Sequence, residues 1–368
     1  MMGLNDPRLL QLAQKIYGDH FARDGQLEKE YDDRRKKLMY EDILYNISFL
    51  MTAVHFSDDK IFTSYARWLY DLLCNLMTDL DRDRIMVQMK DHYQILSDSL
   101  NELPDDLLSN DEKETACLFL QKAISLTQEA VTDIPLSDDF LGNHLGEYRK
   151  AFLDALMRSK TREAYAVIDR AREQGVPILD IYEGILRAVM HEVGRLWHMN
   201  KLTIDKEHYC SSVTQTVMSR FYDELFLQPR QHLTLICCAV GSELHEIGGR
   251  MLSDLFEHNG WDTVYLGAAV PEKALLNAAL EHQPNLIALS VTMPQHLIEC
   301  ESLVRAVKTQ FPGVKIAVGG RAFKMTSRIW EKWPVDYYAD TAAELIEWSQ
   351  QTFRTNKETA PDNSSDQG

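Results

Sequence analysis

The stretch Leu233-Thr-Leu-Ile-Cys-Cys-Ala-Val-Gly-Ser-Glu-Leu-His-Glu-Ile-Gly248 decides the fold of this chain. Its first eight residues are almost all apolar, which is typical of a buried strand. Apolar residues then recur at helical spacing from Ile247 to Phe256, and Asn259-Gly260 predicts the end of that helix. His245 therefore lies in a strand-to-helix loop at the carboxyl edge of an α/β sheet, where such folds bind ligands. Taken alone, a loop histidine is equally well an ordinary surface residue.

Two more polar segments follow apolar runs further along the chain. Ser290-Val-Thr292 comes after a gap of 41 residues and Gly319-Gly320 after another 26. Strands are predicted at 233–239, 262–266, 286–291, 314–318 and 335–338, with helices between them, the second beginning with Pro271 at its first position. The fold class is thus a five-stranded, flavodoxin-like (Rossmann-like) parallel sheet, with all three segments at one edge.

These three segments resemble the cobalamin (B12)-binding module of methionine synthase, corrinoid methyltransferases and B12-dependent mutases, whose pattern is Asp-x-His-x-x-Gly, Ser-x-Leu (or Thr) and Gly-Gly. Glu243 stands in place of the Asp, as in the B12 photoreceptors. The resemblance implies that His245 displaces the dimethylbenzimidazole base and ligates cobalt from below, while the carboxylate fixes its tautomer. The remaining cofactor-binding residues that it implies are Leu244, Glu246 and Gly248 in the loop, Gly267 beside the corrin, and Ser290, Thr292, Gly319 and Gly320 around the nucleotide tail.

A second signal lies near the middle of the chain, where Trp197-His198 is followed by Glu207-His208. Counted from Trp197, nine residues precede the Glu-His pair, and this spacing resembles light-sensing repressors of the CarH and LitR type. There a four-helix cap covers the upper face of the corrin, Trp packs on the adenosyl group, and the Glu-His pair lines the same cavity. The resemblance implies that His198 takes the upper position after photolysis. If the resemblance is set aside, the alternative interpretation is that the segment is a helix end with an aromatic anchor and a solvated charged face.

The segment Ile61-Phe-Thr-Ser-Tyr-Ala-Arg-Trp-Leu-Tyr70 carries an aromatic stripe at helical spacing. Such a stripe is usually bundle core. It also loosely resembles the helical domain of photocobilin-type photoreceptors, which carry a bilin beside B12. That resemblance makes biliverdin a candidate second cofactor, with His55 and Cys74 as contact or attachment points that are equally credible as bundle filler.

The chain of 368 residues is predicted to contain three domains, a linker and a tail. Residues 1–130 form a helical sensor or interaction domain, although 1–37 are polar and include the basic cluster Arg34-Arg-Lys-Lys37. A linker is expected at 131–144, a four-helix cap at 145–228, the B12-binding domain at 230–354 and a disordered tail at 355–368. Within the cap, Thr161 and Thr203 are N-cap candidates, and Pro177 opens a helix running to about His198.

Composition limits the partners. The net charge of −17 argues against direct nucleic-acid binding, and no helix-turn-helix domain is evident. Six scattered cysteines suggest reduced thiols in a cytoplasmic protein, and neither a signal peptide nor a membrane span is apparent. His191-Glu192 lacks the second histidine of a zinc-protease motif.

Three functions follow from these observations. The first is an adenosylcobalamin light sensor, signalling through a partner protein or homo-oligomer and more a receptor than an enzyme. The second is a corrinoid carrier of a methyltransferase system, and the third a B12 store.

Overall fold

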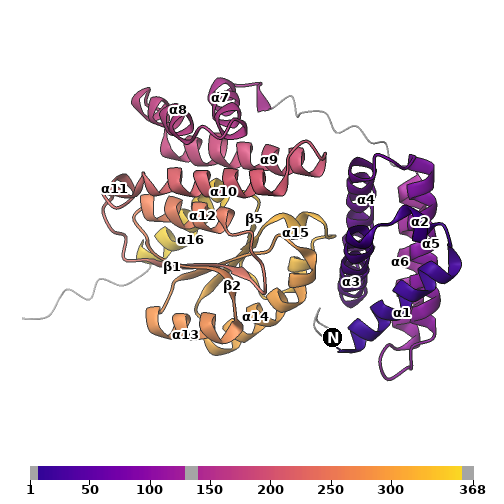
Figure 1. The fold of residues 1–368 in the computed structure, drawn as a ribbon. Helices are drawn as coiled ribbons and strands as arrows, with labels where there is room; N and C mark the ends of the chain where they lie inside the picture. The colour runs from indigo at the N-terminus through magenta and orange to yellow at the C-terminus, as the bar shows by residue number, and fades with distance from the viewer. Residues whose placement is uncertain (1–6, 129–139, 359–368) are drawn as a thin grey trace, which may run out of the picture.

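A computed structural model describes residues 7–128 and 140–358 of this chain. It shows a helical bundle, a layer of cap helices and a five-stranded α/β domain, as Figure 1 illustrates. None of the described helices is both long enough and apolar enough to cross a membrane. The domain boundaries given above stay predictions, and residues 129–139 of the expected linker lie outside the described residues.

The N-terminal bundle includes the polar segment 1–37 from Pro7 onward. It consists of α1 (Pro7–Arg23), α2 (Leu27–Glu30), α3 (Asp33–Phe56), α4 (Asp59–Leu76), α5 (Arg82–Asn101) and α6 (Asn110–Gln128). Helix α1 buries Leu9, Leu12 and Ile16, so the polar segment 1–37 contributes to the core. In the basic cluster, Arg35 bonds Asp79 (2.8 Å) and Lys36 bonds Glu28 (2.6 Å), so these two cations serve the bundle itself.

Aspartates start three of the bundle helices. The side chains of Asp32, Asp58 and Asp81 each accept a hydrogen bond from a backbone N–H in the first turn. Such caps satisfy donors that the helix leaves unpaired. Between them, apolar residues such as Ile47, Phe62 and Leu96 are fully buried and hold the helices together.

The cap contains α7 (Gly146–Met157), α8 (Thr161–Glu173), η2 (Asp180–Arg187), α9 (Ala188–His198) and α10 (Ile204–Ser219), followed by α11 (Tyr222–Leu225). The helix expected from Pro177 to His198 begins with a π-helical segment, η2, which no sequence signal predicted. Buried Arg149 donates a hydrogen bond to the Gly184 carbonyl inside that segment (2.6 Å). Thr203 occupies the N-cap position of α10, but its side chain makes no cap hydrogen bond, and Lys160 rather than Thr161 is the N-cap residue of α8.

The sheet is parallel with strand order β2-β1-β3-β4-β5, which confirms the flavodoxin-like prediction. Its strands are β1 (Thr234–Val240), β2 (Asp262–Val270), β3 (Leu286–Ser290), β4 (Lys315–Gly319) and β5 (Tyr337–Ala339). The connecting elements are α12 (Ile247–His258), α13 (Glu272–His282), η3 (Pro294–His296), α14 (Leu297–Gln310), α15 (Arg321–Lys324), η4 (Ile329–Lys332) and α16 (Ala342–Glu358). Pro271 is the N-cap of α13 rather than its first residue, and α16 continues four residues into the stretch predicted as a tail.

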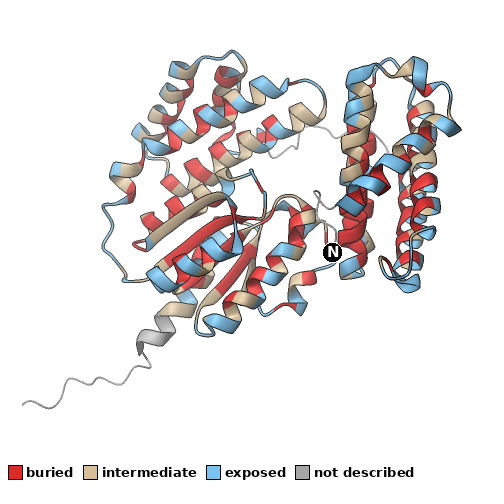
Figure 2. Cartoon of the chain, turned by 60° about the horizontal axis from the view of Figure 1, so that its bottom comes forward, coloured by how far each residue is buried: buried red, intermediate tan, exposed pale blue. Residues whose placement is uncertain are grey.

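The two faces of the sheet belong to two different cores. Leu235, Cys237 and Ala288 pack with α12, α16 and the cap, whereas Ile236, Cys238 and Ile287 pack with α13 and α14. Figure 2 shows the central strands as a buried layer between these helices, whereas the edge strand β2 is only partly buried. Both faces are covered, as the continuous apolar runs of the strands require.

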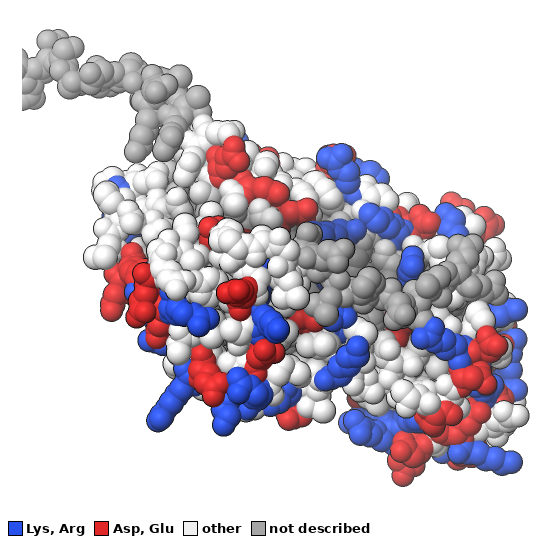
Figure 3. All heavy atoms as spheres, turned by 90° about the horizontal axis from the view of Figure 1, so that it is seen from above, with Lys and Arg blue, Asp and Glu red and all other residues white. Residues whose placement is uncertain are grey.

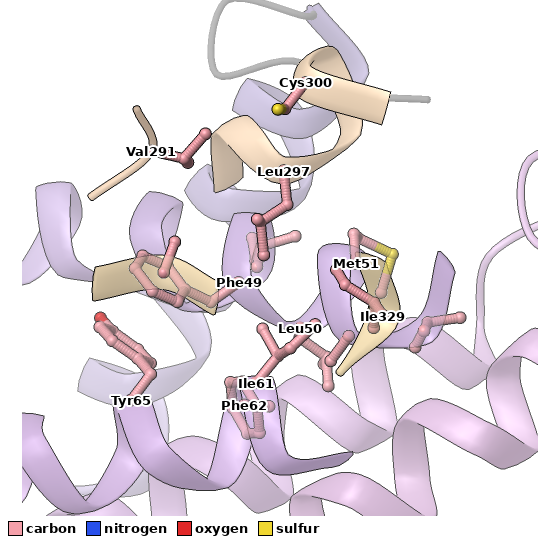
Figure 4. Packing of buried hydrophobic residues seen from close by; sticks show 14 of the residues in the cluster. Phe49, Leu50, Met51, Ile61, Phe62, Tyr65, Val291, Leu297, Cys300 and Ile329 are labelled. Carbon is pink, nitrogen blue, oxygen red and sulfur yellow. The ribbon is translucent and has the colours of Figure 1, made fainter. Parts of the chain in front are cut away.

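The core on the α13 and α14 side of the sheet continues into the bundle. Figure 4 shows Phe49, Leu50 and Met51 of α3 beside Leu297 and Ile329 of the sheet domain. Near them, the side chain of Asp58 accepts hydrogen bonds from the Ser327 hydroxyl (3.0 Å) and backbone N–H. Bundle and sheet domain are therefore packed through a common apolar core with a polar contact at its edge.

Candidate functional site

The loop between β1 and α12 presents His245 at the sheet edge. Its imidazole Nδ1 donates a hydrogen bond to Glu243 Oε1, and its backbone N–H donates to the same oxygen (3.1 Å). The side chain is 62% exposed, so the ring is held on one side and open on the other. Because the proton is engaged on Nδ1, Nε2 is left as the acceptor that suits a metal.

Glu243 joins this loop to the loop after β3. Its carboxylate is 1% exposed, and Oε2 accepts from the backbone N–H groups of Thr292 (2.9 Å) and Met293 (2.8 Å). Burial by itself raises the pKa of Glu243, but the hydrogen bonds from His245 and Met293 outweigh it and lower that pKa to about 2. The carboxylate is thus ionised and holds both loops in place.

The predicted small residues lie where strand ends approach one another. Ser290 is paired with Ala239 on one side and Gly319 on the other. A Cβ on Gly320, where φ is +106°, would lie 2.3 Å from the Val291 carbonyl oxygen. Glycine is therefore required at position 320 by backbone contact, independently of any ligand.

Strand β2 carries a bulge beside the His245 loop. Gly267 has φ of +81° and Ala269 has φ of +54°, and the Ala269 N–H donates to the Glu243 carbonyl (3.0 Å). Ala269 was missed by the sequence reasoning, because its role comes from its backbone rather than its side chain. A Cβ on Gly248, by contrast, would have no neighbour within 4 Å, so the surface there is open.

The cap places its predicted residues on the His245 side of the sheet domain. Trp197 and His198 are half-buried at the end of α9, while Glu207 and His208 lie on α10. The pKa of His245 is raised chiefly by its bond to Glu243, against burial, and in smaller part by the charge of Glu207. Glu207 also accepts from Ser211 (2.8 Å) and pairs with His208 (3.0 Å), whose side chain is 72% exposed.

Direct contacts connect cap and loop. Gln215 of α10 donates to Glu246 (3.1 Å), and the Tyr265 hydroxyl donates to the Glu246 carbonyl (2.9 Å). Leu244 is 77% exposed beside His245, which makes it an apolar surface next to the open imidazole. The predicted residues Leu244, His245 and Glu246 thus lie together in the loop that the cap contacts.

Arg321, directly after Gly319-Gly320, is a site residue that the sequence analysis overlooked. Its charge lowers the pKa of His198 and of His191, in each case after the larger effect of burial, and it opposes the raised pKa of His245. Its charge therefore acts on two histidines of α9 and on His245 of the loop between β1 and α12. The position of Arg321 directly after the glycine pair is the sequence feature from which it could have been predicted as a site residue.

The site suits a metal that brings most of its own ligands. Within residues 7–128 and 140–358, no group of three or more His, Cys, Asp or Glu side chains could hold an ion by itself. His245 offers one nitrogen, oriented by Glu243, on an open apolar surface. A single oriented imidazole fits the axial position of a metal macrocycle.

Comparisons with known proteins agree with this geometry. Residues 233–346 and 148–222 match two models, each described as a B12 binding domain. The chain is 25% identical over 199 residues to the HTH-type transcriptional repressor CarH of Myxococcus xanthus, covering 53% of this chain and 64% of CarH. It is 25% identical to dimethylamine corrinoid protein 3 of Methanosarcina acetivorans, covering 52% of this chain and 91% of that protein.

A solved structure shows the same fold. The monomethylamine corrinoid protein of Methanosarcina barkeri superposes with a TM-score of 0.51 at 21% identity, over 56% of this chain and 99% of that one. The chain spans less than two thirds of the CarH repressor it matches. Two consecutive segments are thus B12-binding by their sequences, and the chain is a cobalamin-binding protein.

Proposed function

We propose that this cobalamin-binding protein is a light sensor that holds adenosylcobalamin through His245, in the base-off form, under a cap carrying Trp197. The supporting observation is the cap itself, in which Trp197-His198 ends one helix and Glu207-His208 lies on the next, on the side that faces the His245 loop. The CarH repressor, similar over 53% of this chain, is consistent with the proposal.

Each residue has a distinct task in this proposal. Bound adenosylcobalamin supplies a cobalt–carbon bond that visible light breaks. His245 offers Nε2 while Glu243 keeps the proton on Nδ1, and half-buried Trp197 shelters the opposite side. His198 is the proposed second protein ligand. Gly319, Gly320, Ser290 and Thr292 are the proposed surroundings of the nucleotide tail.

The output is proposed to be a change of conformation, partner or oligomer in the cytoplasm. The net charge of −17 weighs against direct DNA binding. On the face seen from above, basic and acidic side chains are interspersed rather than gathered by sign (Figure 3). A protein partner or a second copy of this chain is therefore the proposed recipient of the signal.

Biliverdin in the bundle is a separate part of the proposal. Phe62 and Tyr65 are buried, and Tyr65 stacks on Phe49 at 4.0 Å, which favours the core interpretation of the aromatic stripe. His55 pairs with Glu301 (3.5 Å), and burial raises the pKa of the Cys74 thiol, which disfavours the reactive thiolate.

A corrinoid carrier is the second candidate function. The dimethylamine corrinoid protein matches at the same identity as CarH and over 91% of its own length. A carrier would use His245 in the same way, exchanging a methyl group with partner enzymes. The two functions differ in whether light or a partner enzyme changes the cofactor.

Light separates the two functions. We expect protein loaded with adenosylcobalamin in the dark to change its visible spectrum irreversibly under green light, with a different product spectrum in His198→Ala. His282→Ala, a substitution at a histidine on α13, is the matched control and should behave as wild type. A visible spectrum that light leaves unchanged, together with methyl transfer in extracts, would favour the carrier instead. Parallel samples with biliverdin test the second pigment.

A further inference from the structure

The end of α9 is attached to helix α4 of the bundle. The ring of Trp68 lies 5.3 Å from the ring of His198, with 33° between their planes. Asn75 Nδ2 donates to the His198 carbonyl (3.4 Å), and Asn200 Nδ2 donates to the Asn75 carbonyl (3.1 Å). One ring contact and two hydrogen bonds therefore hold residues 198–200 against the bundle.

In this arrangement the metal-binding nitrogen of His198 is enclosed. Its Nε2 is buried and has no hydrogen-bond partner among the described residues. An imidazole nitrogen that is enclosed by protein cannot at the same time coordinate a metal. The ring must turn or move away from Trp68 before Nε2 can coordinate.

Helix α4 is fixed at its other end to the sheet domain. Asp58, its N-cap residue, accepts from Ser327 (3.0 Å), and Lys60 Nζ donates to the Thr326 carbonyl (3.1 Å). Figure 1 shows α4 as the bundle helix that faces the cap. The start of α4 is thus fixed to the sheet domain, and the end of α4 is fixed to the turn after His198. Release of His198 would therefore free only the carboxyl half of α4.

We propose that Trp68 and Asn75 are positioning residues that hold His198 on the bundle, so that attachment to α4 and metal coordination by His198 exclude one another. Movement of His198 then changes the contacts of residues 68–76 and carries the state of the site into the bundle. This inference rests on the proposed function in one respect, the assignment of His198 as a metal ligand.

The first test needs no light. Protein is loaded with hydroxocobalamin in the dark, and the absorbance change that is absent in His198→Ala reports coordination by His198. We expect Trp68→Ala to accelerate that change by about two- to tenfold, the range that loss of an aromatic contact implies. Trp68→Phe should lie between Trp68→Ala and wild type. Arg67→Ala, at the exposed neighbouring position on α4, is the matched control and should leave the rate unchanged.

The second test uses protein without cofactor. We expect amide hydrogen exchange at residues 196–200 to become faster in Trp68→Ala and in Asn75→Ala, and exchange at 72–76 to become faster in His198→Ala. Circular dichroism checks that each variant is folded. If Trp68→Ala does not fold, Asn75→Ala alone is used for the comparison with wild type. This measurement is independent of photochemistry.

The outcomes separate the two proposals. If light leaves the spectrum unchanged but the dark coordination rate responds to Trp68, the light-sensor function is wrong and the positioning role stands. If His198→Ala and wild type give the same hydroxocobalamin spectrum, or if Trp68→Ala, Asn75→Ala and Arg67→Ala all coordinate at the wild-type rate, the positioning role is refuted.

Discussion

Replacement of Glu243 by glutamine tests the centre of the site most directly. The carboxylate accepts two hydrogen bonds on each oxygen, from His245 on one side and from the backbone of Thr292 and Met293 on the other. Glutamine has the same shape but only one accepting oxygen. Its NH2 group would face N–H donors, so either His245 or the 292–293 loop loses its partner.

The size of the effect follows from those contacts. Hydrogen bonds to a charged group contribute roughly 1.5–3 kcal/mol each, and Glu243 is fully buried. Loss of one side of the carboxylate should therefore lower the free energy of unfolding by about 3 kcal/mol. If His245 is the side released, the affinity for cobalamin should fall by roughly 10- to 100-fold, the usual cost of losing the partner that orients a metal ligand.

Two measurements check this prediction. Urea unfolding of the cofactor-free protein, followed by circular dichroism, gives the stability, and titration with hydroxocobalamin gives the affinity. Glu243→Asp keeps the charge with a shorter reach and should lose less than Glu243→Gln. Glu281→Gln, at a carboxylate that is 76% exposed, should change neither quantity. Wild-type stability and affinity in Glu243→Gln would show that the carboxylate does not hold the loops.

Three further predictions concern other parts of the molecule. Gly320→Ala should destabilise the protein by at least about 2 kcal/mol in urea unfolding, because φ is +106° and Val291 is too close, whereas Gly313→Ala, with open space around it, should be neutral. Acid should weaken the bundle, since burial lowers the pKa of His20 to about 4 and that of His92 well below its usual value. Because both imidazoles take up protons more readily in the unfolded chain, the free energy of unfolding is full above pH 6.5 and is about 2 kcal/mol lower per imidazole at pH 5. A melting temperature that is the same at pH 7.5 and pH 5 would contradict this. Asp58→Ala removes a helix cap and the contact with Ser327, so it should cost about 1–2 kcal/mol and speed amide exchange at residues 58–62 and 326–328, with exposed Asp83→Ala of α5 as the control.

Much of the B12-binding fold could be read from local pattern. Five apolar runs with helices between them predict a parallel sheet, because only buried strands are apolar on both faces. The glycine pair and His245 were found by their positions after strands. These are properties of short segments, so periodicity and composition are sufficient to detect them.

Less of the bundle and of the cap could be predicted from the sequence. The bounds of helix α1 were not predicted, although Leu9, Leu12 and Ile16 stand at helical spacing, because the rest of that segment is polar and its burial depends on helices later in the chain. The π-helical segment η2 has no local sequence signature here and coincides with a hydrogen bond from buried Arg149, a residue of another helix.

What the sequence alone determined is the sheet, its ligand edge and the identity of the imidazole that faces it, since strand order and loop position follow from the alternation of apolar runs and helices. Only the tertiary structure decided that Glu243 bridges two loops through backbone N–H groups, that Arg321 lies among three histidines, and that Trp68 holds His198. Those contacts join residues between 49 and 130 positions apart, and apolar periodicity carries no information about which distant backbone or ring a polar side chain will meet.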